Sequence, residues 1–326
     1  MTDRPDPVPE RRDVLIQVMA NSLNFRDLAI ATGLYGGPQP KHNVIPVSDG
    51  AGVVLDVGPD VVGYKPGDRV VGLFRQNWLG GEMPLRAVHS DLGGSRDGML
   101  AERVVLNEEA ICKIPDYMSL MDAATLPCAA LTAWNAVTAG GSVAPGQSVL
   151  VLGSGGVSLF ALQFAKHLGA QVIATTSSNA KAEKLRTLGA DAVVNYRDVA
   201  DWGDAVRALT EGRGVDRVVE TGGSGTLGQS MMAAAVQARI ILIGVLAGEG
   251  RIDPLPILLK RLTIQAISTG SREMMDQMLR AMQAWQMRPV VDQVFAFDDA
   301  RAAYAHLQSG MHFGKVIIGR SDGNSG

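Results

Sequence analysis

The sequence predicts an α/β protein of two domains, one β-rich and one built on a doubly wound parallel sheet, and two patterns support this. Before residue 118, short β-branched segments alternate with turns rich in Gly, Pro and Asp. After it, strands alternate with helices of about ten residues, which is typical of a parallel sheet covered on both faces. The tail returns to strand and turn. We therefore place one domain at residues 1–118 with 271–326 and the other at 119–270, a division that a chain of 326 residues supports.

The expected elements follow from these patterns. In the first domain the strands are at residues 14–18, 52–57, 69–72 and 101–106, and the helix is at 25–32. In the second domain the strands are at 148–152, 171–175, 192–195, 217–220 and 240–243, and the helices at 157–168, 180–188, 202–210 and 226–235. In the tail we expect a strand from residue 295, a helix near 299–307 and a strand at 314–319.

Composition and charge exclude several classes of protein. With 30 basic and 33 acidic residues, the net charge of −3 provides no attraction to nucleic acid. Residues 123–165 carry no charge, but Pro127 and several glycines interrupt this run, so we expect no membrane-spanning helix. Two cysteines, Cys112 and Cys128, are too few for a disulfide scaffold or a four-cysteine zinc lobe. Because residues 1–12 show no export signal, we expect a cytoplasmic protein.

A glycine-rich turn joins the strand at residues 148–152 to the helix that follows it. In the stretch GSGGVS from Gly153 to Ser158, Gly153 permits the tight turn and Gly155 lets the backbone approach a pyrophosphate at the helix N-terminus. A turn that merely connects the two elements is the alternative, but the strand–turn–helix context and the βα units that follow favour a dinucleotide site. Its predicted residues are Gly153, Ser154, Gly155, Gly156 and Val157.

The next strand indicates which dinucleotide binds. An acidic residue about 20 positions after the first glycine normally holds the ribose hydroxyls of NAD, yet no Asp or Glu lies between Ser154 and Ala182. That strand ends instead in Thr176, Ser177 and Ser178, followed by Lys181. Hydroxyls and a cation suit a 2′-phosphate, so we predict NADPH. The alternative is that these are ordinary turn and helix-capping residues.

Several further segments, spread over nearly the whole chain, share the pattern of one family. They are residues 21–27 (NSLNFRD), 47–54 (VSDGAGVV), 65–70 (KPGDRV), 126–133 (LPCAALTA), 188–191 (LGAD) with 195–196 (NY), and 313–316 (FGKV). In these segments the chain resembles the medium-chain dehydrogenase/reductase family. The resemblance implies a GroES-like β-barrel domain made from both chain ends, and a Rossmann domain between them.

The zinc ligands of that family are mostly replaced in this chain. Zinc-dependent members have a Cys where this chain has Asn24, a His-Glu pair at Ser48 and Asp49, and a Cys that matches Cys128. A catalytic zinc needs about three protein ligands, so a lone Cys128 predicts no metal. The alternative for Cys128 is a small buried hydrophobe. The chain is therefore similar to the zinc-independent quinone oxidoreductases and alkenal or enoyl reductases.

The resemblance also implies roles for individual residues. Asn24 resembles the asparagine that meets the cofactor near the nicotinamide, and Arg26 and Tyr35 lie in or just after the family's active-site loop. We expect these three and Thr132, which matches a nicotinamide-contacting threonine, to be catalytic. Asn24 and Thr132 also count among the expected cofactor contacts, of which the others are Lys181, Tyr196, Gly222, Gly244, Val245, Ser268, Thr269, Gly270 and Lys315.

Each of these assignments has a structural alternative. Asn24 can instead cap the helix that begins near Phe25. Arg26 and Asp27 can form a surface pair, and Tyr35 can pack in the first domain. Glu220, which ends the strand at 217–220, can be the buried partner of a basic residue.

Without a metal, hydrogen bonds must polarise the substrate, which suits hydride addition to an activated C=C or a quinone. We therefore predict an NADPH-dependent, zinc-independent oxidoreductase that acts on a small molecule. The alternatives are an alcohol or carbonyl oxidoreductase of the same family and an NADPH-binding protein without turnover. Because the family commonly associates through the edge of its Rossmann sheet, we expect a homodimer formed by residues 240–248 and 254–259.

Overall fold

The structure, a computed structural model, describes residues 2–36, 40–244, 246 and 250–320. The chain forms two compact units, residues 1–131 with 269–326 and residues 132–268. The first break lies after the expected one because α3 (Leu120–Ala123) packs against strands β1 and β2 of the first unit. Within the described residues, no helix combines the length and the apolar character needed to cross a membrane.

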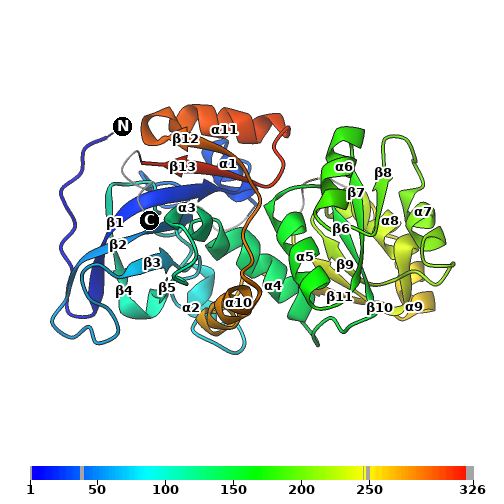
Figure 1. The fold of residues 1–326 in the computed structure, drawn as a ribbon, viewed down its shortest axis with the longest axis horizontal. Coiled ribbons are helices and arrows are strands. Elements are labelled where there is room, and N and C mark those ends of the chain that lie inside the picture. Colours follow the sequence, from blue (N-terminus) through cyan, green and yellow to red (C-terminus); the bar gives the residue numbers. More distant parts are fainter. Residues whose placement is uncertain (1, 37–39, 245, 247–249, 321–326) are drawn as a thin grey trace. The chain divides into compact units, whose positions relative to one another are not determined.

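The first unit contains a seven-stranded sheet drawn from both ends of the chain. Its order is β12-β13-β1-β2-β3-β5, with β4 paired to β1 beside this path. Figure 1 shows the N-terminal β1 beside the C-terminal β13, which pair antiparallel. The strands are β1 (Asp13–Leu23), β2 (Asp49–Val57), β3 (Arg69–Gly72), β4 (Arg103–Asn107), β5 (Ile111–Lys113), β12 (Val291–Ala296) and β13 (Lys315–Gly319).

The expected β-barrel was wrong in one respect: among the described residues, the sheet does not close into a barrel. The length of β1 explains why the sheet stays open. The first part of β1 pairs with β4 and its last part with β13, while β2 pairs along nearly all of it. The sheet therefore branches at β1 instead of returning to its first strand.

Short helices surround this sheet, and one longer helix was not expected from the sequence. That helix, α10 (Arg272–Trp285), buries Met275, Met278, Leu279 and Met282, whose spacing marks one face of an amphipathic helix. The expected tail helix is confirmed as α11 (Ala300–Ser309), which packs on β12 and β13. The remaining helical segments of the unit are α1 (Phe25–Ala31), α2 (Leu85–Val88), a π-helical turn (Leu126–Ala130) and the short 3₁₀ segments Glu108–Ala110 and Phe297–Asp299.

The second unit is the expected doubly wound parallel sheet. Its order is β11-β10-β9-β6-β7-β8, and all its pairings are parallel. The strands are β6 (Ser148–Leu152), β7 (Gln171–Thr176), β8 (Ala192–Asn195), β9 (Val215–Glu220), β10 (Ala234–Leu242) and β11 (Thr263–Ala266). The helices are α4 (Leu131–Thr138), α5 (Gly156–His167), α6 (Asn179–Thr187), α7 (Trp202–Ala208), α8 (Ser224–Ala233) and α9 (Leu255–Lys260), with α5 and α8 on opposite faces of the sheet (Figure 1).

The order of strands places a reversal point between β6 and β9. From β6 the chain continues through β7 to β8 on one side, and then crosses to β9, β10 and β11 on the other. The loops that leave the carboxyl ends of β6 and β9 therefore diverge to opposite faces of the sheet. In open α/β sheets, ligands bind in the crevice at this point.

The close pairing of β1 and β2 leaves no room for a side chain at Gly52, and this can be tested by mutation. A Cβ added there would lie 1.9 Å from the carbonyl oxygen of Gln17 and 2.9 Å from Cγ2 of Ile16. We expect Gly52→Ala to lower the free energy of unfolding by about 3 kcal/mol, the upper end of overpacking costs. Gly228 of α8 is the control, because no atom lies within 4 Å of its added Cβ. There an alanine gains about 0.5–1 kcal/mol. Urea unfolding measures both changes, and equal stability of Gly52→Ala and the parent protein would contradict the register.

Candidate functional site

The turn after β6 leaves room for a ligand above its glycines. Gly153 has a φ of +76°, a conformation that favours glycine, and its N–H donates to the carbonyl of Thr175 at 2.9 Å. Added Cβ atoms at Gly153 and Gly155 would meet no atom within 4 Å. Helix α5 begins after Gly155 without any side-chain cap. The first N–H groups of α5 and the open space above the turn fit a pyrophosphate.

The third position of the glycine pattern has a structural role. Ser158 lies on the first turn of α5 and is buried, and its hydroxyl donates to the carbonyl of Leu152 at 2.6 Å. This bond ties the helix to the end of β6. Ser158 therefore allows the close approach of helix and strand for which the pattern usually has a glycine or an alanine.

A buried carboxylate organises the neighbouring loop at the end of β9. Glu220 is 0% exposed, and its Oε1 accepts hydrogen bonds from the N–H groups of Gly222 at 2.8 Å and Gly223 at 3.0 Å. The hydroxyl of Thr226 donates to the same oxygen at 2.6 Å, and that of Ser230 donates to Oε2. The partners of Glu220 are thus uncharged donors, not the basic residue that the sequence allowed.

The backbone of Glu220 connects the same loop to the end of β10. Its carbonyl accepts from Ile243 at 2.9 Å and from Gly244 at 3.4 Å. A Cβ at Gly244 would lie 2.2 Å from the carbonyl oxygen of Thr221, so only glycine fits there. The structure therefore brings the predicted cofactor residues Gly222 and Gly244 together beside the turn after β6, whereas Val245 lies outside the described residues.

The hydroxyl cluster after β7 is partly used in the turn itself. The hydroxyl of Ser178 accepts from the N–H of Lys181 at 3.5 Å, which caps α6, and that of Thr176 accepts from the N–H of Ser178 at 3.4 Å. The N–H of Tyr196 donates to the carbonyl of Thr176 at 2.9 Å. The capping alternative therefore accounts for Ser178. Within the described part of the chain, the half-buried hydroxyl of Ser177 takes part in no hydrogen bond of this turn.

The residues expected near the nicotinamide are divided between the two units. Thr132 is buried on α4, and one turn later Asn135 donates from Nδ2 to the carbonyl of Ser268 at 3.3 Å. Thr269 and Gly270 belong to the first unit, where a Cβ at Gly270 would lie 2.8 Å from the side chain of Leu131. Residues 268–270 therefore form the return connection from the second unit.

In the first unit, Asn24 lies at the centre of a polar cluster that also contains Asp49 and Lys315. Nζ of Lys315 donates to Oδ1 of Asn24 at 2.6 Å, and Nδ2 of Asn24 donates to Oδ2 of Asp49 at 2.9 Å. The hydroxyl of Ser48 donates to Oδ1 of Asp49 at 2.8 Å, and the N–H of Cys128 to Oδ2 at 3.3 Å. The three positions that the family uses for zinc ligands thus lie together with the tail residue Lys315.

Burial decides the electrostatics of this cluster. Asp49 is 0% and Lys315 3% exposed. Burial raises the pKa of Asp49 to about 6, against the opposing effect of Lys315. Burial also lowers the pKa of Lys315, which the nearby carboxylate of Asp49 counteracts. The pKa of the Cys128 thiol is raised, first by burial and then by the negative charge of Asp49.

These properties do not fit a catalytic zinc, although the family includes zinc enzymes. Asn24 and Ser48 offer an amide and a hydroxyl where zinc-dependent members of the family have a cysteine and a histidine. Lys315 adds a cation to the same cluster. In the described part of the chain, His, Cys, Asp and Glu side chains nowhere gather in a group of three suited to a metal ion.

Asn24 occupies the capping position of α1 and forms a capping box with Asp27. In this box the N–H of Asn24 donates to the carboxylate of Asp27 at 2.8 Å. The amide of Asn24 also reaches Asp49 and Lys315. Asn24 therefore takes part both in the capping box and in the polar cluster.

Arg26 is held away from that cluster. Its guanidinium donates to Oδ2 of Asp91 at 2.5 Å and to the carbonyl of Leu92 at 2.9 Å. It lies over the rings of Tyr35 and Phe74, with centroid distances of 5.3 and 4.7 Å. Arg26 and Asp27 form the ion pair that the sequence allowed, with 3.5 Å between Nη1 and Oδ1, but both residues are buried, so the pair does not lie on the surface. In this arrangement Arg26 anchors α1 to the loop around Asp91, and Tyr35 covers it.

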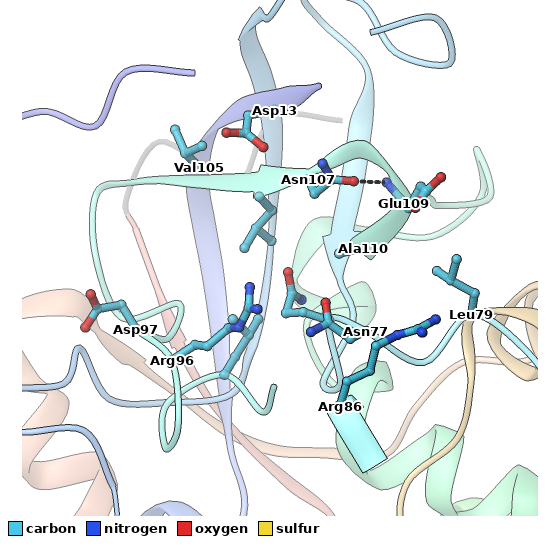
Figure 2. A pocket seen from close by; sticks show the side chains of 13 residues that line it. Asp13, Asn77, Leu79, Arg86, Arg96, Asp97, Val105, Asn107, Glu109 and Ala110 are labelled. Carbon is cyan, nitrogen blue, oxygen red and sulfur yellow. Dashed lines mark hydrogen bonds between the residues drawn. The ribbon is translucent and has the colours of Figure 1, made fainter. Parts of the chain in front are cut away.

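The first unit also contains a cavity that the predicted residues do not line. Its volume is about 580 Å³, and it lies between β4 and the loop that carries α2 (Figure 2). Figure 2 shows Arg86 and Arg96 on its walls together with the carboxylates of Asp13, Asp97 and Glu109. Nζ of Lys41 donates a hydrogen bond to Oδ2 of Asp97 at 2.7 Å. Charges of both signs on the walls define no single class of ligand.

Comparison with known proteins assigns the family. Residues 10–116 match the model of the alcohol dehydrogenase GroES-like domain, and residues 156–284 match that of the zinc-binding dehydrogenases. A zinc-type alcohol dehydrogenase-like protein of Schizosaccharomyces pombe is 43% identical over 94% of this chain and 90% of its own length. The 2-methylene-furan-3-one reductase of Solanum lycopersicum is 30% identical over 95% of this chain and 73% of its own length.

A solved structure supports the same assignment. The crystal structure of a putative alcohol dehydrogenase from Sinorhizobium meliloti superposes with a TM-score of 0.91 at 41% identity, over 97% of this chain and 93% of that one. The resemblance seen in the sequence is thereby confirmed over both units. The chain is an oxidoreductase that belongs to the medium-chain dehydrogenase/reductase family, whose members bind a nicotinamide cofactor.

Proposed function

We propose that this chain is an NADPH-dependent, zinc-independent reductase that transfers hydride to an activated C=C or a quinone. The observation that carries the proposal is the polar cluster of Asn24, Asp49 and Lys315, which sets an amide and a buried carboxylate at two of the family's zinc positions, beside a buried ammonium group. The name of the similar Solanum reductase agrees with reduction of an unsaturated ketone.

The residues of the second unit suit the cofactor. The open turn at Gly153 and Gly155 and the uncapped start of α5 would hold the pyrophosphate. Ser177, directly after β7, and Lys181, on the first turn of α6, would meet the 2′-phosphate. NADPH, when bound, supplies the hydride, and the chain's part is to bind it and to orient the acceptor.

In the first unit, Asn24 supplies a donor for the acceptor's oxygen. Hydride addition to a conjugated carbonyl compound moves negative charge onto that oxygen, where a fixed N–H group lowers the barrier. Asn24 is only half-buried, unlike Asp49 and Lys315. We therefore assign it the direct contact with cofactor and substrate.

We also propose that the protein is a homodimer formed through the sheet edge of the second unit, but the edge expected from the sequence was wrong. The segment at 240–243 belongs to β10, which lies between β9 and β11, so β11 forms the edge. Leu255, Leu258 and Leu259 of the neighbouring α9 are 53–74% exposed and give this edge an apolar border. Light scattering tests the assembly, and a monomeric mass would contradict it.

The reaction class is tested by following NADPH oxidation with a panel of enones, quinones and aldehydes. We expect turnover with enones or quinones. Turnover with aldehydes alone would make the chain a carbonyl oxidoreductase, and tight NADPH binding without any turnover would make it a binding protein.

Cofactor preference is tested at Ser177. We expect Ser177→Asp to lower the ratio of kcat/KM for NADPH over NADH by at least about tenfold, because a carboxylate would repel the 2′-phosphate and favour the ribose hydroxyls. Gln171→Glu is the control, since it adds the same charge at the exposed opposite end of β7. An unchanged ratio in Ser177→Asp would refute the NADPH assignment.

The loop after β9 is tested at Glu220. Glu220→Ala removes the acceptor of Gly222 and Gly223, so we expect NADPH to bind about tenfold more weakly or worse. Glu220→Gln is the matched control, because its amide oxygen can take the Oε1 position while the Ser230 hydroxyl turns to accept from the NH₂ group. We expect it to retain most of the affinity in a fluorescence titration. Equal affinities of Glu220→Ala and the parent protein would show that the loop needs no such support.

A further inference from the structure

We infer that Lys315 and Asp49 are positioning residues that hold the amide of Asn24 in a single orientation for the reduction step. This inference rests on the proposed role of Asn24. The inferred role of Lys315 therefore differs from the cofactor contact that the sequence predicted. Its amine is buried and donates to Asn24 and to the carbonyl of Leu23, each at 2.6 Å.

The chemistry of the two neighbours decides which way the Asn24 amide faces. An ammonium group has only donors, and a carboxylate has only acceptors. Oδ1 of Asn24 must therefore face Lys315, and Nδ2 must face Asp49. A flipped amide would set NH₂ against NH₃⁺ and a carbonyl against a carboxylate, so both hydrogen bonds would be lost in a buried site.

The sheet brings these three residues into line. Lys315 begins β13, Asn24 follows the end of β1 and Asp49 begins β2, and the three strands are neighbours in the order β13-β1-β2. The register pairs Leu23 with Val316 and Ser22 with Asp49. The backbone thus places one charge on each side of the amide.

The two charges depend on the amide between them. Among the described residues, Nζ of Lys315 donates hydrogen bonds to the carbonyl of Leu23 and to Oδ1 of Asn24, and to no carboxylate. Asn24 is the group through which Lys315 and Asp49 interact at hydrogen-bonding distance, and its dipole is aligned with both.

One hydrogen of the amide remains available. Among the described residues, the contacts of Asn24 Nδ2 besides Asp49 are with the hydroxyl of Ser48 and the carbonyl of Ser22, and both are long at 3.5 Å. Because Lys315 and Asp49 fix the plane of the amide, the second N–H bond of Asn24 points in a single fixed direction. It can then donate to a bound ligand without first reorienting.

The test is a double-mutant cycle between Lys315 and Asn24. We expect Lys315→Met to lower kcat for the preferred acceptor at least tenfold, to leave the dissociation constant for NADPH within threefold, and to be partly rescued by Lys315→Arg. Lys113→Met is the control, because it removes a largely exposed lysine of β5 in the same unit. In an Asn24→Ala background, Lys315→Met should change kcat less than twofold, since the residue through which it acts is gone.

Three results would overturn the inference. They are an unchanged kcat in Lys315→Met, an equal loss of NADPH binding and of kcat, and a loss of the same size in the Asn24→Ala background. If Lys315→Met does not fold, Asp49→Asn serves instead, with the same expected loss of kcat and the same cycle. If Asn24→Ala itself leaves turnover unchanged, the proposed role of Asn24 fails, and that outcome is distinct from failure of the Lys315 pair.

Discussion

Charged groups without contact with water must find hydrogen-bonding partners within the protein, and this requirement shapes both candidate sites. In the second unit, Glu220 is satisfied by two backbone N–H groups and two hydroxyls, which hold the loop after β9 in one conformation. In the first unit, Asp49 and Lys315 are satisfied through the amide of Asn24. In each case a buried charge orders a group that we propose to meet the cofactor or the substrate.

This requirement also explains how the family's zinc positions can be used without zinc. Removing a metal from a buried ligand set leaves polar groups that need new partners. Here Ser48 and the N–H of Cys128 donate to Asp49, and the ammonium of Lys315 supplies the positive charge. The cluster is complete in its own hydrogen bonds, and Asn24 retains one hydrogen for a ligand. This arrangement agrees with the zinc-independent reduction that we propose.

Much of the second unit could be predicted from the sequence because its signals are local. The bounds of β6 and β8 match the expected ones, since each is a short apolar strand between turn residues. The left-handed conformation of Gly153 follows from its place in the turn. The edge strand β11 was missed because it is only four residues long and half exposed, so its sequence has neither an apolar run nor a clear alternation.

The first unit was harder to predict because its decisive contacts are distant in sequence. The bond between Asn24 and Lys315 spans 291 positions, and that between Asn24 and Asp49 spans 25, so no local pattern reveals either. The branching of the sheet at β1 likewise depends on pairing with β4 and β13 at once. The helix α10 could have been predicted from the sequence, because its methionines recur at helical spacing.

The central claim, reduction by NADPH without a metal, is tested most directly by measuring turnover and zinc content in one sample. The protein is purified without a histidine tag and dialysed against a strong chelator. NADPH oxidation with an active enone or quinone is then recorded beside elemental analysis. We expect full turnover with zinc far below one ion per chain. Turnover that is lost on dialysis and restored by one equivalent of zinc would contradict it.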